Sequence, residues 1–189
     1  MQRIDMDKTY EAIQLFDRGS NCAQSILYPF SRQFFRDDIS AFRLASAFGG
    51  GIASRGEICG AVSGSLMVIG LHFGYSPADE ISVKAEVLQI SGEFLQAFEH
   101  RFGDLHCNKL LQHDLSTAEG REEAKHSGTF QSVCPALIEG AATILEEILQ
   151  KHPAINRQVS PGPGLKLPGC HRADYIESII YLHIILLSL

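Results

Sequence analysis

Apolar residues recur every three or four positions along almost the whole of this 189-residue chain, and this spacing constrains its fold more than any other feature. Residues three and four apart share one face of an α-helix, whereas residues two apart share one face of a strand. No stretch alternates convincingly between apolar and polar residues. The sequence therefore predicts an all-α fold, a compact single-domain bundle of about six to eight helices.

Glycine, proline and helix-capping residues divide this pattern into segments. The S-x-x-E spacing predicts a capping box at Ser54–Glu57 and a second one at Ser116–Glu119. Pro29 is expected to kink or shorten its helix. The expected helices run over 7–18, from 20 or 21 through 30, over 40–48, 54–73, 77–102 and 104–111, from 116, and from Pro135 to about 152.

Three of these helices have apolar residues at positions that predict a buried face. They are Tyr10, Ile13 and Phe16 in the first helix, Ile81, Ala85, Leu88, Leu95, Phe98 and Phe102 in the fifth, and Leu137, Ile138, Ala141, Leu145, Ile148 and Leu149 in the last.

A change of composition after His152 predicts where the domain ends. The segment that follows contains four prolines and three glycines within PAINRQVSPGPGLKLPGC, which is typical of a linker. We expect a four-cysteine helical domain over 5–152, a Pro/Gly-rich linker over 153–172 and an apolar C-terminal tail helix over 173–189. Three interpretations of the tail are open: packing on the domain, contact with a partner, or translation of a frame-shifted gene end.

Charge and hydropathy exclude several classes of protein. The formal net charge is -6, and no stretch clusters Lys or Arg with aromatic residues, which argues against nucleic-acid binding. The longest apolar run, at the C-terminus, is shorter than the roughly 20 residues that a membrane span needs. The N-terminus lacks the apolar core of a signal peptide, so we expect a cytoplasmic protein whose cysteines are reduced.

Four of the five cysteines fall at or near an expected helix N-terminus. Unpaired N–H groups and the helix dipole at such a position favour a thiolate and lower the pKa of a cysteine. The alternative is that they pack as small buried hydrophobic residues. Their spacings of 37, 48 and 27 residues match no CxxC, zinc-finger or ferredoxin pattern. The four residues are Cys22, Cys59, Cys107 and Cys134.

Small residues dominate the segment after Cys59, which begins GAVSGS. Glycine is a poor helix former, at a cost of about 1 kcal/mol relative to alanine, but it lets a helix approach its neighbours closely. Close approach would serve tight core packing, or it would seat Cys59 against the other cysteines, and the two are compatible.

Four separate stretches carry a family resemblance. They are GSNCAQSIL, FGGGIASRGEICGAVSGSLMVIGL, FGDLHCNKLL and FQSVCPALI, and CGAVSG in the second fits a CGAxxG motif. In this order the motifs resemble the redox-active four-cysteine proteins of the C-GCAxxG-C-C family, over about residues 8 to 150. The resemblance maps the family's four cysteines onto Cys22, Cys59, Cys107 and Cys134, and it implies an all-α domain with a redox or metal role.

The resemblance extends to a domain of the split-Soret cytochromes, which pair it with haem and an iron–sulfur centre. This chain has no CxxCH, so we expect no covalent haem. Cys170 and the residues after about 152 have no counterpart in the family.

Three functions follow as alternatives. The first is a metal centre for electron transfer or sensing, with Cys22, Cys59, Cys107 and Cys134 as ligands of an iron–sulfur cluster or, second, of zinc. Arg55 and His106 would tune or complete it. The second is a metal-free thiol–disulfide protein in which Cys22 or Cys59 attacks. The third is a zinc-stabilised helical module that binds a protein.

The pattern leaves open whether the chain is an enzyme. It contains no Ser-His-Asp arrangement and no nucleotide-binding fingerprint. The expected partners are a redox partner protein and, as a further option, a second copy of the chain, with no nucleic acid and no membrane span.

Overall fold

The computed structural model describes residues 7–76, 79 and 81–152. Within these ranges the chain forms eight α-helices and two 3-10 helices, with no strand, so the predicted all-α fold is confirmed. The α-helices are α1 (Lys8–Asp17), α2 (Cys22–Ser31), α3 (Asp38–Ala45), α4 (Gly60–Phe73), α5 (Ile81–Phe102), α6 (Cys107–Leu111), α7 (Ala118–His126) and α8 (Thr129–Lys151); the 3-10 helices are η1 (Arg32–Phe34) and η2 (Ser46–Phe48).

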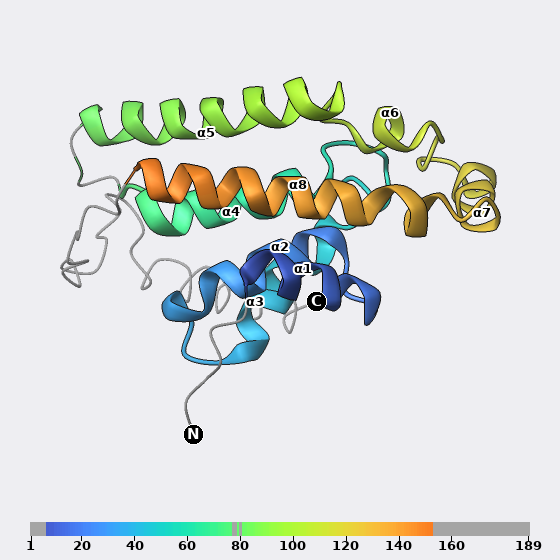
Figure 1. Cartoon of the computed structure of the whole chain (residues 1–189), viewed down its shortest axis with the longest axis horizontal. Helices are drawn as coiled ribbons and strands as arrows, with labels where there is room; N and C mark the ends of the chain where they lie inside the picture. Colours follow the sequence, from blue (N-terminus) through green and yellow to red (C-terminus); the bar gives the residue numbers. More distant parts are fainter. Residues whose placement is uncertain (1–6, 77–78, 80, 153–189) are drawn as a thin grey trace, which may run out of the picture. The chain divides into compact units, whose positions relative to one another are not determined.

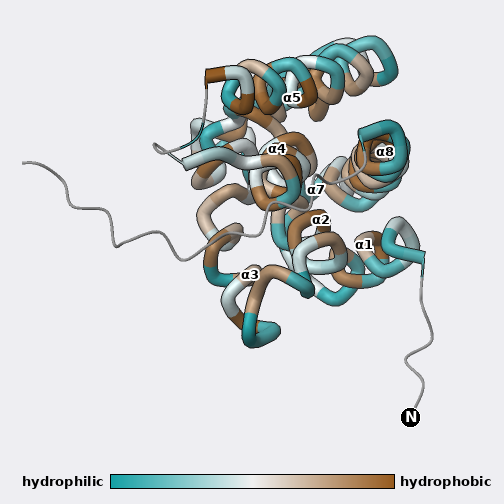
Figure 2. Tube along the Cα trace, turned by 90° about the vertical axis from the view of Figure 1, so that its left-hand side faces the viewer, coloured by the Kyte–Doolittle hydropathy of each residue, from teal (hydrophilic) through white to brown (hydrophobic). Residues whose placement is uncertain are grey.

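The helices pack around α4. Figure 1 shows the long helices α4, α5 and α8 running alongside one another, with α1, α2 and α3 beneath them and α6 and α7 at one end. The end-on view in Figure 2 places α4 among α2, α5 and α8, with apolar residues of α2 and α4 turned toward each other. A helix surrounded in this way is apolar on most of its faces, which explains why α4 is rich in small and aliphatic residues.

The buried faces agree with the sequence in α8 and differ in α1 and α5. Five of the six residues predicted for the buried face of α8 are buried, and the sixth, Leu149, packs against the core. Tyr10 is 53% exposed, because α1 turns Ala12 inward between α2 and α8. In α5 the core residues are Ile90, Phe94 and Phe98, while two residues of the predicted stripe, Ile81 and Leu88, are 87% and 60% exposed.

Several predicted helix starts are wrong, among them the start at 104, because α6 begins at Cys107 with His106 at its N-cap. Ser54 and Glu57 form no capping box, because residues 50–54 form a left-handed turn and α4 begins only at Gly60. Thr117, and not Ser116, caps α7, by accepting a hydrogen bond from the Gly120 N–H at 3.0 Å. Pro135 lies inside α8, which begins at Thr129.

The early start of α8 has a packing reason. Phe130 and Val133, on the turns before Pro135, pack against the cluster that contains Cys107, Leu115 and Cys134. This burial keeps the preceding turns helical although Pro135 has no N–H to donate.

Several expectations concern residues beyond the described ranges. The linker over 153–172, the tail helix over 173–189, Cys170 and the role of Pro77 as a first helical residue all lie outside the described residues. Within the ranges that the structure describes, no helix is long and apolar enough to cross a membrane.

Candidate functional site

Asn21 positions the first cysteine. Its side chain caps α2 by accepting from the Gln24 N–H at 2.9 Å, and Gln24 Oε1 accepts from the Asn21 N–H at 3.0 Å, which completes a capping box. Asn21 Nδ2 also donates to the carbonyls of Ala45 and Ser46, at 3.2 and 3.1 Å. The start of α2 is thereby attached to the end of α3, and Cys22 is the first helical residue, as the sequence predicts.

A short pairing of two loops brings the second and third cysteines together. The Cys59 N–H donates to the Leu105 carbonyl at 2.8 Å, and the Cys107 N–H donates to the Glu57 carbonyl at 2.7 Å. These bonds flank an isolated antiparallel bridge between Ile58 and His106. The N-cap of α4 and the first residue of α6, which are 48 positions apart in sequence, are therefore neighbours in space.

Asn108 anchors this pairing. Its N–H donates to the Gly56 carbonyl at 3.0 Å, its Oδ1 accepts from the Leu115 N–H at 2.8 Å, and its Nδ2 donates to Asp114 Oδ1 at 3.1 Å. A Cβ at Gly56 would lie 1.7 Å from Asn108 Oδ1, so a residue without a side chain is required there.

Two glycines of the CGAVSG segment allow α4 to approach α2. A Cβ at Gly60 would lie 3.0 Å from Cys22 Cβ and 2.9 Å from the Phe48 carbonyl oxygen. A Cβ at Gly64 would lie 2.8 Å from the Ala23 carbonyl oxygen. Tight packing and the seating of Cys59 near the other cysteines are thus one feature of the structure, and both interpretations from the sequence hold.

A left-handed turn precedes this segment. Five consecutive residues have positive φ: Gly50 at 61°, Gly51 at 70°, Ile52 at 55°, Ala53 at 52° and Ser54 at 57°. The left-handed region costs a residue with a Cβ roughly 1–2 kcal/mol, so the turn stores strain next to the cysteines. Backbone hydrogen bonds oppose that strain. The Ala53 N–H donates to the Ala47 carbonyl at 2.7 Å, and the Glu57 N–H donates to the Gly51 carbonyl at 3.0 Å.

Three of the four cysteines pack in one cluster, and Cys59 lies near enough to raise the pKa of Cys22. Cys22, Cys107 and Cys134 belong to one cluster of packed side chains that also includes Leu111, Leu115, Phe16 and Phe130. The Cys22 and Cys134 thiols each shift the pKa of the other, and Cys59 and Cys107 also raise the pKa of Cys22. No disulfide joins the four residues. Cys134 is the sixth residue of α8, so the prediction that all four lie at helix N-termini is wrong for this one.

The pKa values differ from the expectation that helix N-termini lower them all. Burial raises the pKa of Cys59 to about 11, although the backbone N–H groups of Ala61 and Val62 oppose the rise. Burial also raises the pKa of Cys107, and the hydrogen bond to Cys134 together with burial raises that of Cys22. Desolvation disfavours a buried thiolate, and here it outweighs the helix ends.

Cys134 is the exception. The hydrogen bond from the Cys22 thiol lowers the pKa of Cys134, because it stabilises the thiolate more than the thiol. The two thiols titrate as a pair. The pKa of the first deprotonation is lowered, and that of the second is raised because both sulfur atoms share the remaining proton. The sequence suggested Cys22 or Cys59 as the attacking thiol and did not single out Cys134, since nothing there indicated that it lies near Cys22.

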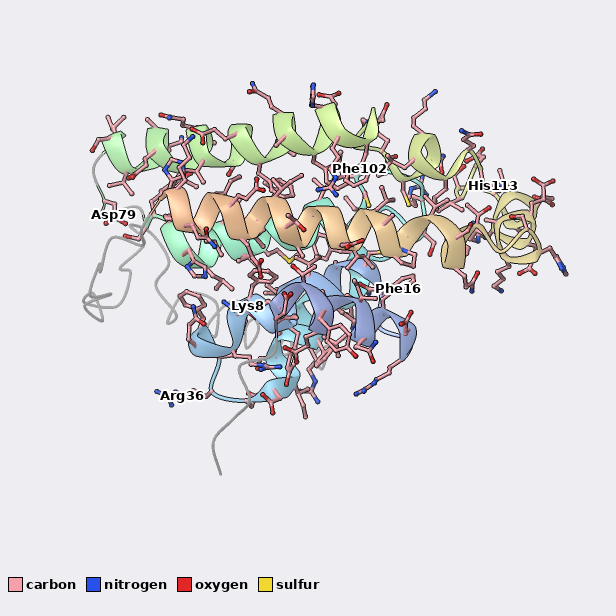
Figure 3. All side chains as sticks on the ribbon, viewed as in Figure 1. Lys8, Phe16, Arg36, Asp79, Phe102 and His113 are labelled. Carbon is pink, nitrogen blue, oxygen red and sulfur yellow. The ribbon has the colours of Figure 1, made fainter. Side chains whose placement is uncertain are left out.

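A cavity of about 570 Å³ opens onto these thiols. Cys22, Cys107 and Cys134 line it, whereas Cys59 does not and is 1% exposed. Phe16, labelled in Figure 3, projects from α1 at the end of the bundle where α7 and the start of α8 lie, and it forms part of the cavity wall. The remaining lining residues are Asn21, Ser46, Ala47, Gly49, Gly50, Ala53, Ser54, Leu115, Arg121, Glu122, Lys125 and Phe130.

The residues expected to assist a metal site point elsewhere. His106 is half-exposed, and its Nδ1 lies 2.8 Å from Asp104 Oδ1. Arg55 is exposed and does not line the cavity. Among the residues that the structure describes, no three His, Cys, Asp or Glu side chains are grouped so that they could hold one metal ion. The thiols are near one another without forming a ready set of ligands.

Comparison with known proteins agrees with the four-cysteine arrangement. The family described as "Putative redox-active protein (C_GCAxxG_C_C)" matches residues 20–148, a range that contains all four cysteines of the site. The comparisons with curated proteins and with solved structures found no significant match. The match covers more than half of the chain, and the protein therefore belongs to the C_GCAxxG_C_C family.

Proposed function

We propose that the protein is a thiol–disulfide redox protein whose reacting pair is Cys22 and Cys134. Their shared position carries this proposal, because Cys22 packs against the cluster that contains Cys134, and the lowered pKa of Cys134 supports it. Both residues line the same cavity, so a reactant can reach them. The pair comes from α2 and α8, far apart in the chain, which explains why no CxxC motif is present.

The chemistry requires only these two residues and a disulfide substrate. The Cys134 thiolate attacks one sulfur of the substrate, forms a mixed disulfide and releases the first substrate thiolate, which takes up a proton. Cys22, deprotonated as that group leaves, then attacks Cys134 Sγ, closes the Cys22–Cys134 disulfide and releases the second substrate thiol. Two electrons pass from the protein dithiol to the substrate disulfide, and the reverse sequence oxidises a dithiol partner.

The other two cysteines have different places in this scheme. Cys59 is buried beyond the cavity with a pKa of about 11, so it stays a thiol near neutral pH. Cys107 lines the cavity, and its raised pKa makes it a slower third thiol. The expectation from the sequence that Cys59 attacks is therefore not part of the proposal, and Cys22 becomes the resolving thiol.

An iron–sulfur or zinc centre is a second proposal, supported by the convergence of four thiols in a family of redox-active proteins. Thiolates suit both metals. The described side chains do not fit such a centre as they are arranged, because no group of three donors faces one point. A metal would require Cys59 and Cys107 to move toward the pair and to lose protons that burial retains.

One purification separates the two proposals. Protein prepared without oxygen is analysed for iron, acid-labile sulfide and zinc, and its thiols are then titrated before and after treatment with a mild disulfide oxidant. We expect no stoichiometric metal, a loss of two thiols on oxidation, and a Cys22–Cys134 crosslinked peptide by mass spectrometry. Stoichiometric iron and sulfide that disappear in Cys59→Ser would overturn the dithiol proposal in favour of a cluster.

Variants give the matched controls. Cys22→Ser and Cys134→Ser should each abolish the two-thiol loss, whereas Cys170→Ser, at a cysteine outside the family motifs, should retain it. Retention of the full loss in Cys134→Ser would show that another pair reacts.

A further inference from the structure

The cavity beside the reacting pair has the size of a small-molecule site. Its volume of about 570 Å³ falls within the roughly 300–1,000 Å³ typical of ligand pockets. Three thiols form part of its wall, and the left-handed turn contributes Gly50, Ala53 and Ser54. Strained backbone of this kind occurs preferentially at functional sites.

One wall of the cavity is cationic. Arg121 and Lys125 lie one turn apart on α7, so their side chains share a face of the helix, and both line the cavity. Arg121 Nη1 donates to the Leu115 carbonyl at 2.7 Å, which holds the half-buried guanidinium at the wall and uses one of its five N–H donors.

One carboxylate lies in the same wall and reduces this charge. Glu122 also lines the cavity, and its Oε1 is 3.0 Å from Lys125 Nζ, in an exposed ion pair. Arg121 and Lys125 balance Glu122 and the attacking Cys134 thiolate in number, so the wall of α7 supplies the positive charge that faces an anionic ligand. The whole chain carries a formal net charge of -6, so its long-range field repels anions, and attraction of an anion must come from this local wall.

The remaining walls suit an organic molecule. Phe16, Leu115 and Phe130 offer apolar surface, and the side chains of Asn21, Ser46 and Ser54 offer hydrogen-bonding groups. A ligand that fits has an apolar or amide body, an anionic end toward α7 and a sulfur that reaches Cys134.

We propose that the substrate is a low-molecular-weight disulfide bearing a carboxylate, whose acidic end binds Arg121 and Lys125 while its sulfur atoms meet the Cys22–Cys134 pair. This inference rests on the proposed function and specifies its substrate class. The reaction is the exchange described above: the protein dithiol becomes a disulfide, and the substrate disulfide is reduced to two thiols, at least one of them carrying the carboxylate.

The test compares three simple disulfides of different charge: dithiodiglycolate, a dianion, 2-hydroxyethyl disulfide, which is neutral, and cystamine, a dication. The rate at which each oxidises the full-length reduced protein is followed by quenching with an alkylating reagent. Each rate is divided by the rate of the same disulfide with free dithiothreitol, which removes differences in intrinsic reactivity. We expect the normalised rate to be about tenfold higher for the dianion than for the neutral disulfide, and to saturate with its concentration.

The double variant Arg121→Gln/Lys125→Gln should lose this preference, so that its normalised rates with the dianion and with the neutral disulfide become similar. The matched control Arg43→Gln/Lys84→Gln removes two exposed cations that do not line the cavity, and it should keep the preference. Equal normalised rates for all three disulfides, or an unchanged preference in the Arg121/Lys125 variant, would overturn the substrate assignment and leave the dithiol chemistry intact. Failure of every disulfide to oxidise Cys22 and Cys134 would overturn the proposed function itself.

Discussion

The contact between Cys22 and Cys134 shows how one neighbour reverses the effect of burial. Both sulfur atoms lie in the same cluster, but only Cys134 has its pKa lowered, because it accepts the hydrogen bond that Cys22 donates. At Cys59 the backbone N–H groups of Ala61 and Val62 only partly oppose burial, and burial raises the pKa values of both Cys59 and Cys107. In the proposed dithiol chemistry, the Cys22 S–H group would favour Cys134 as the attacking thiol.

Removing that donor should raise the pKa of Cys134. In Cys22→Ala the stabilising hydrogen bond is lost and burial remains, so the pKa should move above the ordinary value of 9.0. The measurement is the rate of alkylation of Cys134 by iodoacetamide against pH, followed by mass spectrometry. The midpoint should shift upward in Cys22→Ala and stay in place in Cys170→Ser; an unchanged midpoint in Cys22→Ala would contradict the assignment.

Gly60 is the second decisive residue. Its missing side chain lets α4 pass Cys22 at contact distance, so Gly60→Ala should force the helices apart and destabilise the fold by about 1–3 kcal/mol. Gly92→Ala is the matched control, because a Cβ there meets nothing within 4 Å and the helix should gain about 0.5–1 kcal/mol. Chemical denaturation measures both. Equal effects of the two substitutions would contradict the packing argument.

Among the elements, the left-handed turn over residues 50–54 is the one most costly to form. It connects η2 to the loop before α4 and shapes the cavity wall, and three of its five residues carry a Cβ at positive φ. Strain of this kind persists only where the surrounding contacts determine the conformation. The pairing of residues 56–59 with 105–108 supplies such contacts.

Glycine at this turn should stabilise the protein. Ala53→Gly relieves the steric cost of φ 52° and is expected to raise the free energy of unfolding by about 0.5–1 kcal/mol. The same substitution at an exposed position of a regular helix, Ala85→Gly in α5, should lower the free energy of unfolding by a similar amount. Urea denaturation measures both changes. A gain of stability in Ala53→Gly with a loss in Ala85→Gly would confirm the left-handed conformation of residue 53, and a loss in both variants would contradict it.

Glu93 of α5 links that helix to the C-terminal end of α8. Its carboxylate is 2.7 Å from Lys151 Nζ and 3.0 Å from His152 Nε2, and these bonds, with one from Gln89, lower the pKa of Glu93 to about 2. The unfolded value is near 4.5, so the link contributes stability above pH 4.5 and loses it as pH falls from 4.5 toward 2.

Acid unfolding should therefore depend on Glu93. Unfolding free energies measured between pH 5 and 2.5 should fall less steeply in Glu93→Gln than in the wild type, because the amide binds no proton. The two proteins should converge at the acid end of the range. Identical slopes would mean that this ion pair does not hold α8 to α5 in solution.

At the scale of the molecule, the two cysteines of the proposed reacting pair lie far apart in the sequence of the domain. A disulfide between residues 22 and 134 would close a loop of roughly 110 residues, for which the chain-entropy model gives up to about 4–5 kcal/mol of stabilisation. Oxidation should thus raise the denaturation midpoint of the wild type. The increase should be absent in Cys22→Ser treated in the same way, and a lowered midpoint in the oxidised wild type would show that the disulfide strains the fold.

The fold class was predictable because the repeat of apolar residues along a helix is visible within a short stretch of sequence. The spacing of apolar residues identified the all-α class and the inward face of α8. Glycine and capping residues located α1 and the start of α2. Errors arose where tertiary packing overrode a local signal: Pro135 within α8, the Ser54–Glu57 spacing in a left-handed turn, and the exposed Ile81 and Leu88 of α5.

The candidate site was likewise predictable from the sequence only in part. The sequence by itself determined the family and the four cysteines of its motifs, because short runs of residues carry both signals. Only the tertiary structure decided that Cys134 meets Cys22, that Cys59 lies behind the cavity and that Arg121 and Lys125 line it. Protonation and access depend on burial and on neighbours distant in the chain, and local spacing encodes neither.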